Sequence, residues 1–196
     1  YLLGPELIAL GFQAREELPL VSLAGPYLDE LSALTGDTVH LGIREGDEVL
    51  YLLKNPGRNG PEMRSRVGHR MPLARTGIGK ALMLDDAPQD WQRLYDISLP
   101  AGGKSQFWPQ HPQQSWEQLE QRMTEYVAGG YAFDLEDNEP SIRCVAAPIR
   151  DASKRIVAAI SIASTVPYMP LEKMAELIPL IKGVTARLSA ELGLKV

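Results

Sequence analysis

The chain has 196 residues, of which 44% are hydrophobic and 23% charged, and these values are typical of one globular domain with a buried core. A net charge of −5 makes the chain a poor candidate for holding the phosphate backbone of a nucleic acid by itself. Its single cysteine excludes an internal disulfide and a cluster of thiolate metal ligands. No apolar run approaches the roughly 20 residues that cross a bilayer, and no basic-then-apolar leader opens the sequence, so we expect a cytoplasmic protein.

Two helices are predicted at the start of the chain. The first is expected to begin at Pro5, which suits the first turn of a helix, and to stop at Gly11. The second is expected over residues 20–34, with Gly36 ending it. Its buried stripe is expected to be Ala24, Leu28, Leu31 and Leu34, which recur at helical spacing.

Strands are predicted next. Residues 38–44 and 48–53 predict a hairpin, because a polar turn separates two β-like runs. Residues 63–67 predict a further strand, and residues 68–72 a turn.

The middle of the chain predicts three helices. Residues 75–84 are typical of a loop entering a helix, and residues 88–95 predict a second short helix. Residues 101–114 have no period and predict a loop. Ser115 and Gln118 fit a capping box at the start of the third helix. Its expected buried stripe is Leu119, Met123, Tyr126 and Val127.

The last third predicts a second hairpin and a long helix. The hairpin comprises residues 143–151 and 156–164, and the helix starts near Pro170 and is expected to kink at Pro179. Because the strands come as hairpins rather than alternating with helices, we predict an antiparallel sheet and an α+β domain.

A series of short motifs spans nearly the whole chain. They are residues 1–4 with 10–11, 35–41, 67–73 with 77–81, 130–136, 143–149 and 158–162. Together, and in this order, these motifs closely resemble the C-terminal effector-binding domain of the IclR family of bacterial transcription regulators.

The resemblance implies a GAF-like fold, a curved antiparallel sheet flanked by helices, with residues 1–196 forming a single effector-binding domain. It also implies self-association as a dimer or tetramer, and binding of a small-molecule effector that is often a carboxylate. DNA would be bound only through a missing N-terminal winged helix-turn-helix domain, with residues 1–15 as the end of its linker, and a start at Tyr1 fits this. The resemblance implies no enzymatic activity, and no cofactor, metal or membrane contact is expected.

Gly77 and Ile78 are candidate effector-binding residues. They precede a predicted helix, so their backbone N–H groups are free of helix partners and available to an anion. Glycine also lets the backbone approach a ligand closely. Spacing alone favours a glycine-rich turn without a ligand, whereas the resemblance places both residues at the family's effector site.

Cys144 and Ser161 lie on the two strands of the second hairpin. From the sequence, Cys144 is a small buried hydrophobe, a weak donor in a pocket or a nucleophile, and the resemblance favours the pocket. The hydroxyl of Ser161 interrupts an apolar run and needs a partner, either a ligand carboxylate or a backbone carbonyl. Ala163 shares the strand face of Ser161 and stands where some relatives have a second serine, so this face offers one hydroxyl fewer.

Asp134 falls where the family places a polar pocket residue. It is expected to accept a hydrogen bond from a ligand hydroxyl, to be protonated through burial, or only to cap the acidic loop over residues 136–139. Met71 and Ile142 are candidate apolar walls of the pocket, together with Leu73 and Val145, although the sequence favours core packing for any one of them.

Three other classes of function stay open at this point. An enzyme would use Cys144 as nucleophile and His40 as base, although His40 lies in a predicted strand and reads as structural. A GAF-type sensor would bind a cyclic nucleotide, or a tetrapyrrole on Cys144. A purely structural dimerisation domain would bind no ligand. The histidines share no metal-ligand spacing with one another or with acidic residues.

Overall fold

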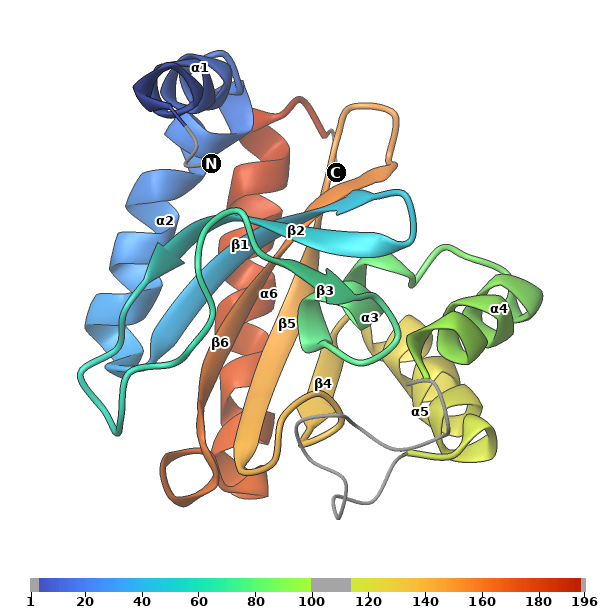
Figure 1. Cartoon of the computed structure of the whole chain (residues 1–196). Helices are drawn as coiled ribbons and strands as arrows, with labels where there is room; N and C mark the ends of the chain where they lie inside the picture. The colour runs from blue at the N-terminus through green and yellow to red at the C-terminus, as the bar shows by residue number, and fades with distance from the viewer. Residues whose placement is uncertain (1–3, 100–113, 195–196) are drawn as a thin grey trace.

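One six-stranded antiparallel sheet organises the domain, with strand order β3-β2-β1-β6-β5-β4 (Figure 1). A computed structural model describes residues 4–99 and 114–194. The strands are β1 (Thr38–Glu45), β2 (Glu48–Asn55), β3 (Arg70–Pro72), β4 (Ala132–Leu135), β5 (Ile142–Arg150) and β6 (Ile156–Thr165). The helices are α1 (Pro5–Glu16), α2 (Pro19–Thr35), α3 (Gly77–Leu82), α4 (Pro88–Ser98), α5 (Trp116–Gly129) and α6 (Leu171–Glu191), with a short 3₁₀ turn, η1 (Val166–Tyr168). The predicted α+β class is therefore confirmed.

Helices cover both faces of the sheet. On the outer face, α2 and α6 pack against an apolar core that includes Val145 and Ile160. On the inner face lies α3, which contacts β4, β5 and β6 and is followed by α4 and α5 (Figure 1). A second apolar cluster, with Ile78 and Met123 among its members, fills the space between α3, α5 and the sheet. The inner face is therefore the one that carries the start of α3.

Several local signals act as the sequence predicts. At Gly36 the backbone turns left-handed with φ of 71°, and its N–H donates to the carbonyl of Ser32, so α2 ends there. The capping box of α5 is formed, because Ser115 Oγ accepts from the Gln118 N–H and Gln118 Oε1 accepts from the Ser115 N–H. The last helix starts one residue beyond Pro170 and runs through Pro179.

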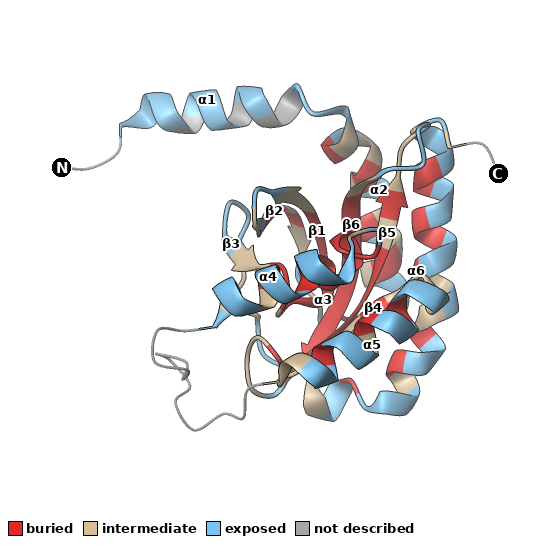
Figure 2. Cartoon of the chain, turned by 90° about the vertical axis from the view of Figure 1, so that its right-hand side faces the viewer, coloured by how far each residue is buried: buried red, intermediate tan, exposed pale blue. Residues whose placement is uncertain are grey.

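Other predictions about the helices are wrong. The first helix passes through Gly11, because a glycine ends a helix only where the backbone takes a left-handed conformation, and Gly11 does not. This helix projects from the body of the domain (Figure 2). Leu34 is 64% exposed and Val127 is 45% exposed, so neither belongs to a buried stripe. Both lie at the margin of the helix face that meets the core, where periodicity alone does not decide burial.

The predicted strand over residues 63–67 is also wrong. There, Lys54 Nζ donates to the carbonyls of Met63 and Ser65, so a side chain takes the place of a neighbouring strand. The third strand of the sheet is β3, in the segment where a turn was expected. The short strand β4 pairs with β5 and was not predicted.

A bulge in the β1–β2 hairpin decides which side chains reach the inner face. Leu41 pairs with Leu53 and Gly42 pairs with Tyr51, so Leu52 has no partner on β1. The extra residue reverses the alternation of side chains along β2. As a result, Tyr51 packs in the inner cluster while Leu53 packs in the outer core.

Candidate functional site

A row of four side chains crosses the inner face of the sheet. Thr38 on β1 pairs with Ala163 on β6, Ala163 pairs with Cys144 on β5, and Cys144 pairs with Asp134 on β4. Directly opposed residues of antiparallel strands point to the same face. Three of the residues that the sequence singled out, Asp134, Cys144 and Ala163, are therefore brought together.

A second row runs beside the first. His40 on β1 pairs with Ser161 on β6, Ser161 pairs with Ala146 on β5, and Ala146 pairs with Ala132 on β4. Ser161 therefore lies one row away from Cys144 and opposite His40.

The start of α3 lies directly on these rows. A Cβ built on Gly77 would be 2.4 Å from Cys144 Sγ and 3.6 Å from the Cβ of Ala146. Ile78, the next residue, packs against Gly42 of β1, where a Cβ would be 3.0 Å from Ile78 Cγ2. Thr76 fixes the helix start by accepting the Gly79 N–H on its hydroxyl, at 3.0 Å. Gly77 is thus required by close approach to Cys144.

Cys144 is a protonated thiol in this environment. Burial is the main cause that raises the pKa of Cys144 to about 12, and the charge of Asp134 raises it further. The backbone N–H groups of Gly77 and Asp134 act in the opposite sense and lower it. The Gly77 N–H therefore lies near the sulfur, at the start of α3. A reactive cysteine needs a lowered pKa and exposure, and Cys144 has neither.

Asp134 is buried beside Cys144. Burial raises the pKa of Asp134 to about 7, against the opposing charge of Lys80. One of its oxygens, Oδ1, accepts the backbone N–H of Asp137 at 2.8 Å. Asp134 therefore caps the acidic loop, and burial shifts its pKa in the direction that favours the protonated form.

A buried ion pair that the sequence did not single out lies behind Asp134. Lys80 of α3 is fully buried, and its Nζ donates to Asp137 Oδ2 at 2.5 Å and to the carbonyl of Phe133 at 3.1 Å. Arg122 of α5 also contacts the Asp137 carboxylate, at 3.1 Å. Lys80, Arg122 and their hydrogen bonds lower the pKa of Asp137 although burial opposes them. This cluster connects α3 and α5 to the loop that follows β4 and carries Asp137.

His40 and Tyr51 border the opposite side of the site. The rings are 5.1 Å apart between centroids, and His40 Nε2 is 2.7 Å from Ser65 Oγ. Burial, and then the charge of Lys54, lowers the pKa of His40 to about 3, so the imidazole is neutral. A base that is fully buried and bonded to Ser65 has no route to a nucleophile, which agrees with the structural interpretation of His40.

Two hydroxyls in the site make no hydrogen bond to residues 4–99 and 114–194. They belong to Ser161 and Tyr51, residues that are only 3% and 8% exposed. The backbone carbonyl that was an alternative partner for Ser161 is not used. Within the described ranges, the fully buried side-chain nitrogen and oxygen atoms that lack a partner do not include either hydroxyl, so both oxygens keep some access from outside.

The expected apolar walls divide between the two faces. Met71 on β3 is partly buried against the inner cluster, and Leu73 is buried within it. Ile142 lies two residues before Cys144 and so shares its face, partly exposed. Val145 is buried in the outer core against α2 and α6, so core packing, the other role considered for it, is the one it has. Adjacent residues of a strand point to opposite faces, which is the reason.

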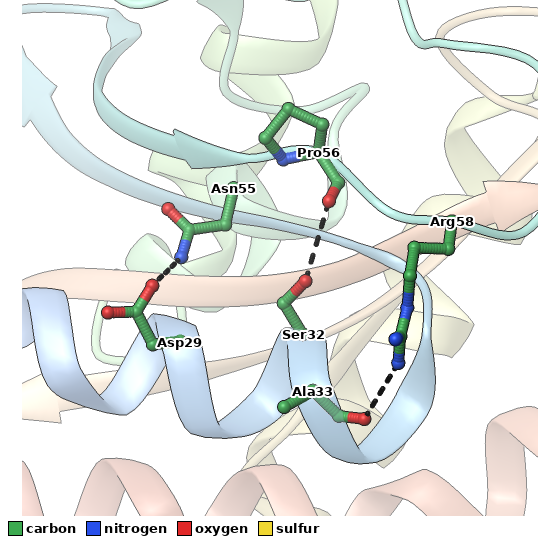
Figure 3. Close-up of a pocket in the computed structure, with 6 residues that line it drawn as sticks. All are labelled: Asp29, Ser32, Ala33, Asn55, Pro56 and Arg58. Carbon is green, nitrogen blue, oxygen red and sulfur yellow. Dashed lines mark hydrogen bonds between the residues drawn. The ribbon is translucent and has the colours of Figure 1, made fainter.

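A surface depression elsewhere on the domain is a different feature (Figure 3). It lies between α2 and the end of β2, and its lining residues are Asp29, Ser32, Ala33, Asn55, Pro56 and Arg58. These residues bond to each other, since Asn55 donates to Asp29, Ser32 to the carbonyl of Pro56, and Arg58 to the carbonyl of Ala33. Its polar groups are thus used to hold the two elements together.

Further expectations concern metals, membranes and the long loop. Within the described ranges, no group of three or more acidic, histidine or cysteine side chains is placed to hold a metal ion. The helices seen in the same ranges are all too short or too polar to span a membrane. The predicted loop over residues 101–114, and the question of whether it covers the pocket, lie outside the described residues except for Gln114.

Comparisons with known proteins agree with this geometry. Residues 12–190 match the family model described as "Bacterial transcriptional regulator IclR C-terminal". The regulator XynR of Escherichia coli is 30% identical over 98% of this chain and 75% of its own length. The IclR protein of Thermotoga maritima has a TM-score of 0.83 at 28% identity, over 98% of this chain and 76% of that one. The C-terminal domain of E. coli KdgR has a TM-score of 0.72 at 26% identity, over 90% and 99% of the two chains. The chain therefore belongs to the IclR family of bacterial transcriptional regulators, and the part of the family that it matches is the C-terminal domain.

Proposed function

We propose that this chain is the effector-sensing domain of a longer IclR-type regulator. It binds a small organic acid or a related metabolite on the inner face of the sheet, and occupancy controls DNA binding by an N-terminal domain. Members of this family are regulators rather than enzymes, and they bind small-molecule effectors and DNA. In this proposal residues 1–196 are one effector-binding domain, and residues 1–15 are the end of the linker. The projecting helix α1 supports that division (Figure 2). The domain self-associates as a dimer or tetramer.

One observation carries the ligand site: two hydroxyls, those of Ser161 and Tyr51, reach the same face as Cys144 and Asp134 and make no hydrogen bond within the described part of the chain. A ligand that bonds to them gains about 0.5–1.5 kcal/mol for each hydrogen bond.

Removing the Ser161 hydroxyl is expected to weaken ligand binding without harming the fold. A panel of alkanoates, 2-oxo acids, aldonates and aromatic acids is screened for acids that raise the melting temperature, since a ligand specific to the native state stabilises it. For an acid that does so, Ser161→Ala is expected to raise the dissociation constant about three- to tenfold, the value of one hydrogen bond.

Ser164→Ala is the matched control. Ser164 lies on the same strand and is as buried as Ser161, but it points to the opposite face. It is expected to leave the dissociation constant unchanged. A wild-type chain that no acid stabilises, or equal responses from both variants, would contradict the proposed site.

Binding of a carboxylate is expected to weaken as the pH rises above 7. A ligand carboxylate beside Asp134 repels its ionised form, so above its pKa of about 7 binding must be accompanied by proton uptake. Lys80 and Asp137 face Asp134 as an ion pair, and Cys144 stays protonated in this range. The dissociation constant should rise by up to about tenfold per pH unit above 7.

Titrations between pH 6 and pH 9 on wild type and Asp134→Asn check this expectation. The asparagine has no proton to take up, so the variant should give a nearly flat profile. A wild-type profile as flat as that of the variant would show that the bound acid does not lie beside Asp134.

A further inference from the structure

The phenol of Tyr51 is a polar group that the fold itself does not need. Tyr51 lies in the inner apolar cluster with its ring against His40. Within residues 4–99 and 114–194, its hydroxyl makes no hydrogen bond. A phenylalanine would bury the same ring, so the packing of the ring does not require the hydroxyl. The hydroxyl is therefore available for a role other than packing.

Neighbouring groups fix the phenol as a hydrogen-bond donor. Burial, and then Cys144 and Asp134, raise the pKa of Tyr51, so it carries its proton at neutral pH. The nearest polar ring, that of His40, is neutral and is bonded through Nε2 to Ser65. The backbone of Tyr51 is also fixed. The Tyr51 N–H donates to the carbonyl of His69, and the Tyr51 carbonyl accepts the Gly68 N–H. A ligand would thus meet a fixed donor at this edge of the site.

The three polar groups around the site all form hydrogen bonds with hydroxyls. The Tyr51 phenol on β2 and the Ser161 hydroxyl on β6 can each donate or accept, and the carboxyl of Asp134 on β4 accepts and, when protonated, also donates. A hydroxyl is the simple group that both donates and accepts. A carbon chain with several hydroxyls satisfies all three positions, whereas a plain alkyl chain satisfies none.

We infer that Tyr51 is a specificity-determining residue, and that it selects hydroxylated acids over plain alkanoates by donating to an oxygen on the carbon chain of the ligand. This inference rests on the proposed function, because it assigns a ligand class to the same site.

The test compares acids that differ only in their hydroxyls. Straight-chain aldonates of four, five and six carbons are titrated beside alkanoates of equal length. The wild-type chain is expected to bind at least one aldonate more tightly than its matched alkanoate. Tyr51→Phe is expected to weaken aldonate binding about three- to tenfold and to leave alkanoate binding unchanged or stronger. Without a ligand, Tyr51→Phe should melt at the same temperature as wild type or higher.

Tyr126→Phe is the matched control. Tyr126 is another buried tyrosine of the inner cluster, but it lies on α5, and the backbone of Phe133 is close enough to act on the pKa of its phenol. Its substitution should lower the melting temperature and leave the aldonate-to-alkanoate ratio unchanged.

Each remaining outcome overturns the inference. A Tyr51→Phe variant with the wild-type ratio, or a wild type that binds alkanoates more tightly than every aldonate, would refute it and leave the proposed function standing. A wild type that is stabilised by no acid of the broad panel would refute both. A lower melting temperature of Tyr51→Phe together with an unchanged ratio would assign the phenol a structural role.

Discussion

Replacing Gly79 by alanine is expected to lower the free energy of unfolding by about 3 kcal/mol or more. A Cβ at this position would lie 2.1 Å from the carbonyl oxygen of Leu73 and 2.5 Å from its Cα. These are backbone atoms, which cannot rotate away as a flexible side chain can. The clash is relieved only if α3 moves off the inner face, and this would also displace Gly77 and Ile78 from the site.

Urea unfolding of Gly79→Ala beside Gly183→Ala measures this effect. Gly183 lies in α6 with no atom within 4 Å of the position of a Cβ, so alanine there should stabilise the helix by about 0.5–1 kcal/mol. The two identical substitutions should therefore act in opposite directions. If Gly79→Ala unfolded within about 1 kcal/mol of wild type, then the backbone of Leu73 would not confine α3.

The hairpin that carries Cys144 and Ser161 illustrates what the sequence makes predictable. Its two apolar runs, its short polar turn and the alternation of side chains are all local, and they place Cys144 and Ser161 on one face once the register is known. The ordered series of family motifs then identified the fold and the place of Gly77. Applying the same alternation to Val145 would have excluded it from the pocket.

Tyr51 shows what local patterns cannot supply. Counted by alternation, Tyr51 and Leu53 share a face, and both would be assigned to the core. The unpaired Leu52 separates them, so that only Tyr51 reaches the inner face. A bulge depends on how two strands align, and no residue of β2 signals it. The predicted strand over residues 63–67 failed for a similar reason, because its partner is the Lys54 side chain rather than a strand.

Lys80 was missed because burial of a charge is a tertiary property. From the sequence, a lysine on a short helix is expected to be exposed to solvent. The partner of Lys80, Asp137, is 57 residues away in the sequence. Lysine and aspartate are seldom fully buried unless they are paired. The pairing follows only from the packing of α3 against the loop that follows β4.

Lys80→Met is expected to lower the free energy of unfolding by about 3–5 kcal/mol, because it leaves a buried carboxylate without its closest cation. Methionine keeps the length and the apolar stem of lysine, so the substitution leaves little empty space and little stability is lost to a cavity. Arg122 remains 3.1 Å from Asp137 and moderates the loss, which places the expected value near the lower end. Denaturant unfolding at pH 7 gives the difference. As an exposed comparison, breaking the Arg93–Asp47 ion pair should change stability little or not at all.

Two further measurements separate the missing charge from a packing defect. Adding Asp137→Asn to Lys80→Met should cost less than the sum of the single substitutions, because the unpaired carboxylate is removed. The penalty should also depend on pH. Lys80 holds the pKa of Asp137 below its usual value, so the stability contributed by the pair is present above the unfolded pKa of about 4 and is lost as the pH falls through the folded pKa. The difference between wild type and Lys80→Met should therefore shrink in acid, whereas a packing defect would persist at every pH.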